Sequence, residues 1–159
     1  MNAQEMFDSA TLAKIDKIAS INGSLKKMRE DNLVSMFSAS VTRHFRFFCH
    51  GRFLVYYEDD PSYKDTPKNI VVLDEIIDVK NDHEGKKGHF LLTMKNGHNM
   101  HLKHDEAKVS DAWIKAIRDL KAYYKDKALG LIDINRKWKE KADIRVQMMV
   151  VEELESKIK

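Results

Sequence analysis

Three histidines, His98, His101 and His104, have the residue type and spacing that most suggest a chemical site. Imidazole nitrogens are common metal ligands, so this repeat raises the question of a metal centre. The surrounding residues alternate as they do in a strand, and residues three apart in a strand point to opposite faces. His98 and His101 therefore cannot easily converge on one ion, and we interpret the histidines as polar residues of a hairpin. The sequence predicts no metal site and no cofactor.

Other signatures of catalysis are absent from the sequence. It has no phosphate-binding glycine loop, no paired-cysteine zinc motif and no nucleophile elbow. The only cysteine, Cys49, lies beside His50 in a turn and could be exposed, but nothing nearby indicates an activated thiol. A single cysteine excludes an internal disulfide framework, which suits a reducing compartment. We therefore expect a protein that is not an enzyme.

The composition is that of a small, mildly basic protein. The 159 residues are enough for one domain with appendages, and the formal charge is only +3. Binding to an anionic surface would thus depend on where the cations lie rather than on their sum. No apolar run is long enough to span a bilayer, and neither a signal peptide nor a myristoylation signal is present. These features predict a cytoplasmic protein whose contact with a membrane is peripheral.

Alternating apolar and polar residues predict a set of short strands. The segment 41–47 places Val41, Phe45 and Phe47 on one face, and residues 49–52 then supply a hairpin turn. Asn96-Gly97 is the strongest hairpin signal in the chain. The predicted strands are 23–29, 41–47, 53–57, 69–73, 76–80, 89–94 and 98–103.

The period then changes to that of a helix. Asp105 is a plausible N-cap, and apolar residues that include Trp113 recur at helical spacing up to Leu120. A helix capped by Ser9 or Asp8 is expected before the strands, and a second helical extension is expected over 133–159. The fold class is mostly β with helices, or α+β by content: a seven-stranded antiparallel barrel or sandwich capped by a helix.

The order of these segments resembles that of the pleckstrin homology (PH) domain superfamily. The resemblance rests on Lys26-Lys27, residues 43–47, residues 54–59 and the single-tryptophan helix around Trp113. It covers about 100 residues and implies a PH-like domain over 23–126, with helical extensions at 1–22 and 127–159. Small phosphatidic-acid-binding PH proteins of the acylated apicomplexan type are a conceivable relative.

The resemblance also implies a site for anionic lipid headgroups at the open end of the barrel. Convergent lysine and arginine donors favour phosphate oxygens, which are strong acceptors. The resemblance therefore implies a non-catalytic membrane-targeting module whose partner is an anionic membrane lipid. The residues expected to bind the headgroup are Lys26, Lys27, Arg29, Arg43, Tyr56, Lys64, Lys86 and Lys87.

The basic motif is incomplete. The strongest phosphoinositide binders in this superfamily place two basic residues, separated by one position, at the start of the second strand. In the register that buries Phe45 and Phe47, Arg43 matches the second position but the first is Val41. We therefore favour looser binding of phosphatidic acid or a monophosphorylated inositol lipid over tight recognition of a polyphosphorylated one.

The loop after the first strand is a second possible membrane contact. Its apolar residues could enter the acyl boundary beside the basic site, or they could pack on the barrel. These membrane-insertion candidates are Leu33, Val34, Met36 and Phe37.

The C-terminal helix leaves a second function open. Its apolar stripe must pack on the domain, dimerise or bind a protein partner, so the barrel could be an architectural part of an interaction scaffold. The candidate partner-binding residues are Ile144, Met148, Val151, Leu154 and Ile158. Nucleic acid is not an expected partner, because the alternation assigns Phe45 and Phe47 to the core.

Overall fold

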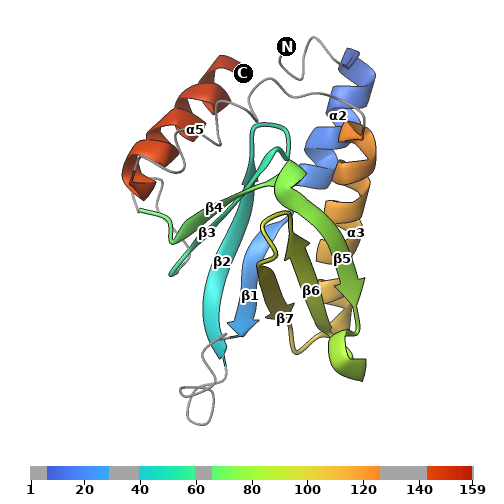
Figure 1. Cartoon of the computed structure of the whole chain (residues 1–159). Helices are drawn as coiled ribbons and strands as arrows, with labels where there is room; N and C mark the ends of the chain where they lie inside the picture. Colours follow the sequence, from blue (N-terminus) through green and yellow to red (C-terminus); the bar gives the residue numbers. More distant parts are fainter. Residues whose placement is uncertain (1–6, 29–39, 60–65, 126–142, 159) are drawn as a thin grey trace.

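Seven antiparallel strands and three α-helices form the described part of the computed structural model, which covers residues 7–28, 40–59, 66–125 and 143–158 (Figure 1). The strands are β1 (Asn22–Met28), β2 (Ser40–Phe48), β3 (Phe53–Tyr57), β4 (Asn69–Val72), β5 (Ile76–Asn81), β6 (His89–Met94) and β7 (Asn99–Lys103). The α-helices are α2 (Ser9–Ala19), α3 (Ala107–Tyr124) and α5 (Ile144–Ile158). Short 3-10 helices η1 (Leu73–Glu75) and η2 (His83–Gly85) precede and follow β5. The predicted seven-stranded antiparallel architecture with a helix after the last strand is confirmed.

The strands belong to one sheet in the order β4-β3-β2-β1-β7-β6-β5. Strand β1 joins the two halves, because it pairs with both β2 and β7. Its register sets Lys27 opposite Val41 and Leu25 opposite Arg43. Because side chains alternate between faces, Leu25 and Lys27 share the inner face, whereas Lys26 points outward.

Helices α2 and α3 pack together on one side of the sheet (Figure 1). Asp8 caps α2 by accepting a hydrogen bond from the Thr11 backbone N–H, as predicted. The prediction that Asp105 caps α3 is wrong, since the N-cap is Glu106. The Asp105 carboxylate instead accepts hydrogen bonds from the Lys26 ammonium at 3.0 and 3.2 Å. An ion pair with a distant strand has replaced the local cap.

The main core lies between the inner face of the sheet and α3. The Trp113 side chain is 2% exposed, and its ring centroid lies 6.2 Å from that of Phe45 and 5.9 Å from that of Phe47. Phe45 in turn lies 5.0 Å from the ring of Tyr56 on β3. The phenylalanines are therefore core residues, as the alternation indicated.

Helix α5 covers the outer face of β2, β3 and β4 and makes a second core (Figure 1). Its residues Met148 and Val151 are buried against the sheet, and Ile144 and Leu154 are packed at the edge of the cluster. Of the expected helix over 133–159, residues up to 142 lie outside the described part, and so does the side chain of Ile158. The described apolar residues of α5 therefore pack on the sheet of the same chain.

The β2–β3 turn places Cys49, His50 and Gly51 in the left-handed region, with φ of 55°, 55° and 80°. A methyl group on Gly51 would lie 2.7 Å from a carbon of Leu120, which is fully buried on α3. We expect Gly51→Ala to lower the free energy of unfolding by about 2 to 4 kcal/mol through backbone strain and overpacking. Urea denaturation measures this change.

Gly97 provides the matched control for this substitution. Its φ is +88°, but a methyl group there would meet no atom within 4 Å. Gly97→Ala should therefore cost only the backbone term, about 1 to 2 kcal/mol. Equal losses in the two variants would show that the contact with Leu120 contributes nothing.

Candidate functional site

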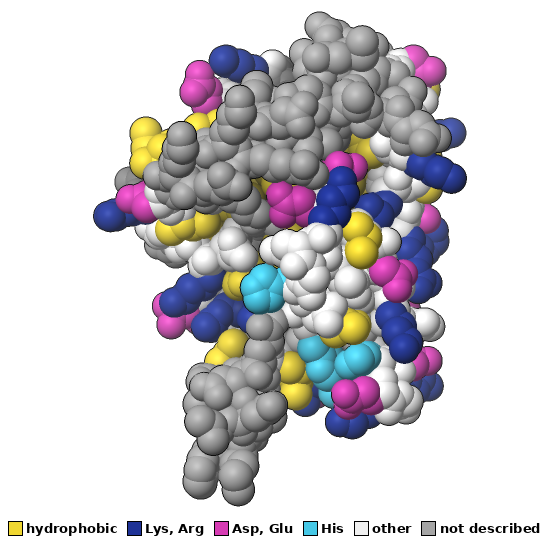
Figure 2. Space-filling model, in the orientation of Figure 1, with side chains coloured by type: hydrophobic (Ala, Val, Ile, Leu, Met, Phe, Trp, Pro, Cys, Tyr) yellow, Lys and Arg dark blue, Asp and Glu magenta, His cyan; other side chains and the backbone are white. Residues whose placement is uncertain are grey.

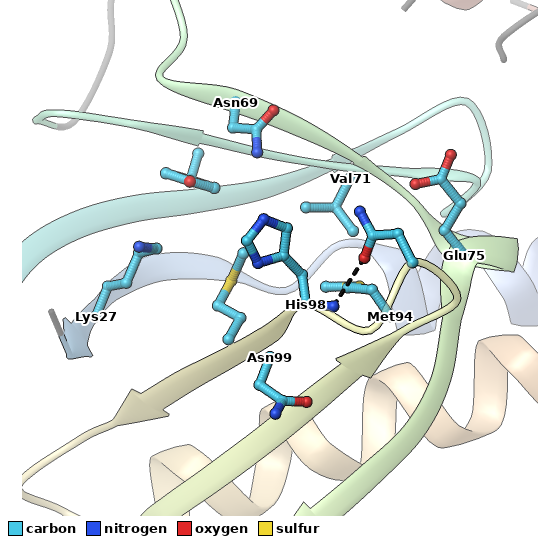
Figure 3. A pocket seen from close by; sticks show the side chains of 10 residues that line it. Lys27, Asn69, Val71, Glu75, Met94, His98 and Asn99 are labelled. Carbon is cyan, nitrogen blue, oxygen red and sulfur yellow. Dashed lines mark hydrogen bonds between the residues drawn. The ribbon is translucent and has the colours of Figure 1, made fainter. Parts of the chain in front are cut away.

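A cavity of about 220 Å³ opens at one end of the barrel between β1, the start of β4 and the β6–β7 turn (Figure 3). We call it the mouth cavity. Its lining residues are Lys27, Tyr56, Asn69, Val71, Glu75, Met94, Asn96, His98, Asn99 and Met100.

The cavity has an apolar floor and a polar rim. Tyr56, Val71, Met94 and Met100 are each at most 8% exposed, so they close the cavity toward the core. The rim consists of amide side chains, one imidazole, one ammonium and one carboxylate. A floor of this kind excludes water from one side of a ligand, and a polar rim can orient it.

The lining of the mouth cavity contains one ammonium group and one carboxylate. Figure 3 shows Lys27 and Glu75 on opposite sides with His98 between them. The Lys27 ammonium has neither an ion pair nor a hydrogen bond within the described part of the chain. An anion would thus meet an uncompensated cation on the β1 side and a carboxylate on the other.

The β6–β7 turn fixes one wall of the cavity. The Asn96 side-chain oxygen accepts a hydrogen bond of 2.9 Å from the His98 backbone N–H, and Gly97 takes a φ of +88°. The turn is closed by a second bond, in which the Met94 N–H donates to the His98 carbonyl at 2.8 Å. This Asn-Gly turn, predicted from the sequence, therefore holds the imidazole of His98 in the cavity.

Two of the eight predicted headgroup residues, Lys27 and Tyr56, meet in the mouth cavity. Lys26 lies on the outer face of β1 and is paired with Asp105, which lowers the pKa of that carboxyl. Arg43 has the inward position expected from its register, but its guanidinium donates to the Thr42 carbonyl and does not line the cavity.

The remaining predicted residues are elsewhere or are not described. Lys86 and Lys87 lie in the connection between β5 and β6 and do not line the mouth cavity. Arg29 and Lys64 fall outside the described residues. The membrane-insertion candidates also fall outside them; these are Leu33, Val34, Met36 and Phe37.

Five polar residues of the rim were not predicted as site residues: Asn69, Glu75, Asn96, His98 and Asn99. Asn69 and Asn99 each begin a strand, where an inward or rim position depends on how neighbouring strands cross. The Asn96-Gly97 turn is the sequence signal that could have identified some of these residues, because a hairpin turn places its neighbours at an end of the barrel.

The expectation that Cys49 could be exposed is wrong. Its side chain is fully buried, and its Sγ lies 3.6 Å from the Val151 carbonyl oxygen of α5. Burial, with Glu155 nearby, raises the pKa of the thiol to about 12. The Cys49 backbone N–H also donates to the Glu155 carboxylate.

The three histidines of the sequence repeat, His98, His101 and His104, lie in different surroundings and do not converge. His98 lies in the mouth cavity, His101 lies on the outer face of β7, and the Nδ1 of His104 accepts a hydrogen bond from the Glu106 backbone N–H. In the described ranges, no group of three or more histidine, cysteine or acidic side chains is arranged to hold a metal ion. In the same ranges, no helix has the length and apolar character needed to cross a membrane.

An antiparallel sheet packed against a helix, with a cavity at one end, defines a class of fold rather than one activity. The family model of the PH domain matches residues 19–122. The chain belongs to the PH domain family.

Solved structures with the same fold include several PH domains. The PH domain from TgAPH has a TM-score of 0.54 at 14% identity and covers 74% of this chain and 94% of its own. The human oxysterol-binding protein-related protein 11 PH domain has a TM-score of 0.56 at 15% identity, covering 69% and 87%. The Slm1 PH domain, solved with inositol-4-phosphate, has a TM-score of 0.50 at 18% identity, covering 63% and 93%. No curated protein matches the chain.

Proposed function

We propose that this chain is a non-catalytic module that binds the phosphate of an anionic phospholipid headgroup in the mouth cavity and so attaches peripherally to a cytoplasmic membrane surface. The observation that carries the proposal is Lys27, a cation without a partner among the described residues, at the rim of a cavity with a buried floor. Lysine binds phosphate as a point charge, and partial shielding from water strengthens the contact.

Related domains support this choice of ligand. The Slm1 PH domain was solved with inositol-4-phosphate, and the C-terminal PH domain of pleckstrin was solved with an inositol pentakisphosphate at a TM-score of 0.50. The PH family consists mainly of binding modules without catalysis, and a headgroup site in this chain agrees with that. The three rim asparagines could donate to phosphate or hydroxyl oxygens beside Lys27.

The charge balance favours a lightly phosphorylated lipid. Glu75 faces Lys27 across the cavity, so each further phosphate would approach a carboxylate. Arg43 does not add a second cation to the lining. One phosphate, as in phosphatidic acid or a monophosphorylated inositol lipid, fits this arrangement better than several.

The alternative of a protein-interaction scaffold has a structural requirement. The candidate residues Met148 and Val151 are 4% and 0% exposed, on the side of α5 that packs on the sheet. A partner or a second copy could reach them only if the helix left the sheet. The outward side of α5 does expose Val146 and Met149. Self-association in ultracentrifugation would favour this alternative.

Vesicle co-sedimentation tests the proposed function. Vesicles would contain phosphatidic acid, phosphatidylserine or one phosphoinositide at a time. We expect Lys27→Glu to weaken binding to the preferred lipid by about tenfold to a hundredfold, because it removes a charge-assisted contact and repels phosphate.

Lys115→Glu is the matched control. It makes the same change in net charge at a side chain that is 76% exposed on α3, outside the mouth cavity. It should lower binding far less than Lys27→Glu does. Equal losses would indicate attraction by overall charge instead of a site, and no binding by the wild-type chain to any vesicle would contradict the proposal.

A further inference from the structure

Three histidines from three elements meet on the outer face of β6 and β7. His83 belongs to η2, His89 is the first residue of β6 and His101 lies in β7. The ring of His101 lies 4.7 Å from that of His83 and 5.0 Å from that of His89, measured between centroids. We call these residues the histidine cluster, and Figure 2 shows histidine side chains gathered near the lower end of the face in view.

The contact between His89 and His101 depends on their protons. The Nδ1 of His89 and the Nε2 of His101 are 2.8 Å apart and form a hydrogen bond. One nitrogen must donate and the other must accept, so only one proton can lie between them. If both rings were protonated, two N–H groups would face each other across this distance. The bond therefore exists only while at least one ring is neutral.

Groups around the cluster also oppose added positive charge. Lys86 from the β5–β6 connection and Lys103 from β7 are cations near the rings, and the Glu84 carboxylate counters them. Burial, with His83 and His89 next to it, lowers the pKa of His101 to about 4. Burial and then Lys103 lower the pKa of His89 as well. The His89 and His101 rings are therefore neutral at pH 7.

The segment that carries His83 is strained. Asp82 and Glu84 take φ of 47° and 57°, the left-handed region that side chains other than glycine rarely adopt. Such a backbone persists only where surrounding contacts hold it. The Nδ1 of His83 is buried and has no hydrogen-bond partner within the described residues, and its Nε2 lies 3.5 Å from a Glu84 carboxylate oxygen of the same segment. Ring packing on His101 is a contact that joins this side chain to β7.

The far end of the β5–β6 connection is fixed independently. The Gly88 carbonyl accepts hydrogen bonds from the Ser110 hydroxyl at 2.6 Å and from the His104 backbone N–H at 3.2 Å. These bonds do not involve the histidine cluster. Loss of the cluster would therefore leave residues 82–87 held by backbone bonds within the connection and by the bond of 3.2 Å from the His89 N–H to the Lys86 carbonyl, while Gly88 and the barrel stayed in place.

We propose that the histidine cluster is a proton-sensitive latch, which holds the β5–β6 connection against β7 while its rings are neutral and releases it when they are protonated. The connection carries Lys86 and Lys87, so the latch fixes where these two cations lie on the surface. This device is separate from the mouth cavity, whose lining shares no residue with the cluster.

The direction of the pH dependence follows from the lowered pKa values. In the released state the His89 and His101 rings regain the ordinary pKa of 6.5, so this state binds more protons than the latched state between pH 6.5 and about 4. The latched state is therefore fully favoured above pH 6.5. Its advantage is lost as the pH falls through this range.

Nuclear magnetic resonance of the full chain from pH 7.5 to pH 3.5 tests the latch. We expect the imidazole of His101 to titrate well below 6.5. Over the same range, backbone order parameters of Gly85 and Lys86 should fall from about 0.85 to below about 0.6. The amide of Leu92, which is fully buried in β6, reports in the same spectra that the barrel stays folded.

His101→Gln should abolish the pH dependence of the order parameters at Gly85, because glutamine cannot take up the proton. His83→Gln tests the same contact from the other side if the first variant does not fold. His44→Gln, on β2, removes a histidine outside the cluster and should leave the pH dependence intact. The latch is contradicted if His101 titrates near 6.5, or if the loop order does not change, or changes equally in His101→Gln.

Discussion

Val151→Asp should make Cys49 react with a disulfide reagent about a thousandfold faster at pH 8. In the wild-type chain α5 covers the thiol, with the Val151 carbonyl 3.6 Å from Sγ, and burial raises the thiol pKa from 9.0 to about 12. A carboxylate at a fully buried valine has no partner, so the helix should leave the sheet. Return of the pKa to its ordinary value raises the thiolate fraction by about three orders of magnitude.

The reaction rate reports on Cys49 alone, because it is the only cysteine of the chain. Met149→Asp is the matched control, since that side chain is 67% exposed on the opposite side of the same helix. It should leave the thiol unreactive. If both variants react alike, α5 is lost for reasons of helix propensity, and if neither reacts, the helix is not what shields Cys49.

The barrel itself should survive release of α5. The cluster beneath α5 consists of outward-facing residues of β2, β3 and β4, whereas Trp113 and Phe45 belong to the separate cluster on the inner face. Circular dichroism of Val151→Asp should therefore keep the strand signal. Because the two clusters are separate, release of α5 should not unfold the proposed headgroup site.

The parts of the fold that the sequence predicted are those with local signals. The alternation over 41–47 identified β2 and its buried face, and Asn96-Gly97 identified the β6–β7 turn. The stripe around Trp113 identified the helix that completes the core. Each signal depends on residues within about ten positions of one another, and packing did not override it.

The parts that failed depend on residues distant in the chain. Asp105 has the type and position of an N-cap, but Lys26 binds it from β1. Cys49 lies in a turn, where exposure is the usual outcome, yet α5 returns more than 100 positions later to cover it. No local pattern contains either contact.

In the candidate site too, residues with a local sequence signal were predicted and residues joined by distant contacts were missed. Lys27 and Tyr56 were found because alternation gives the inward face of a strand. The histidine cluster was missed because the sequence pointed to His98, His101 and His104, while the fold joins His101 to His83 and His89. Strand pairing sets His89 next to β7, and only a register shows that.

The rings between α3 and the mouth cavity link the stability of the domain to its proposed site. Trp113 packs on Phe45, and Phe45 packs on Tyr56, which is part of the cavity floor. A loss at the tryptophan is therefore expected to reach the headgroup site through two side chains. Neither Phe45 nor Trp113 lines the mouth cavity.

Trp113→Ala should lower the free energy of unfolding by about 3 to 5 kcal/mol, because it leaves a large cavity in a core where the ring is 2% exposed. This is a large share of the about 5 to 15 kcal/mol that typically stabilises a domain. Urea denaturation followed by far-ultraviolet circular dichroism measures it, with Lys115→Ala on the exposed side of α3 as the control. Trp113→Phe keeps a ring against Phe45, so its free energy of unfolding should fall less.

The same variants separate stability from binding. At a temperature where Trp113→Ala remains folded, its vesicle binding should still be weaker than that of the wild type, because the floor under Tyr56 has lost support. Trp113→Phe should bind almost normally. A loss of stability below 1 kcal/mol in Trp113→Ala would contradict the packing argument, and normal vesicle binding by folded Trp113→Ala would show that the mouth cavity does not depend on the ring stack.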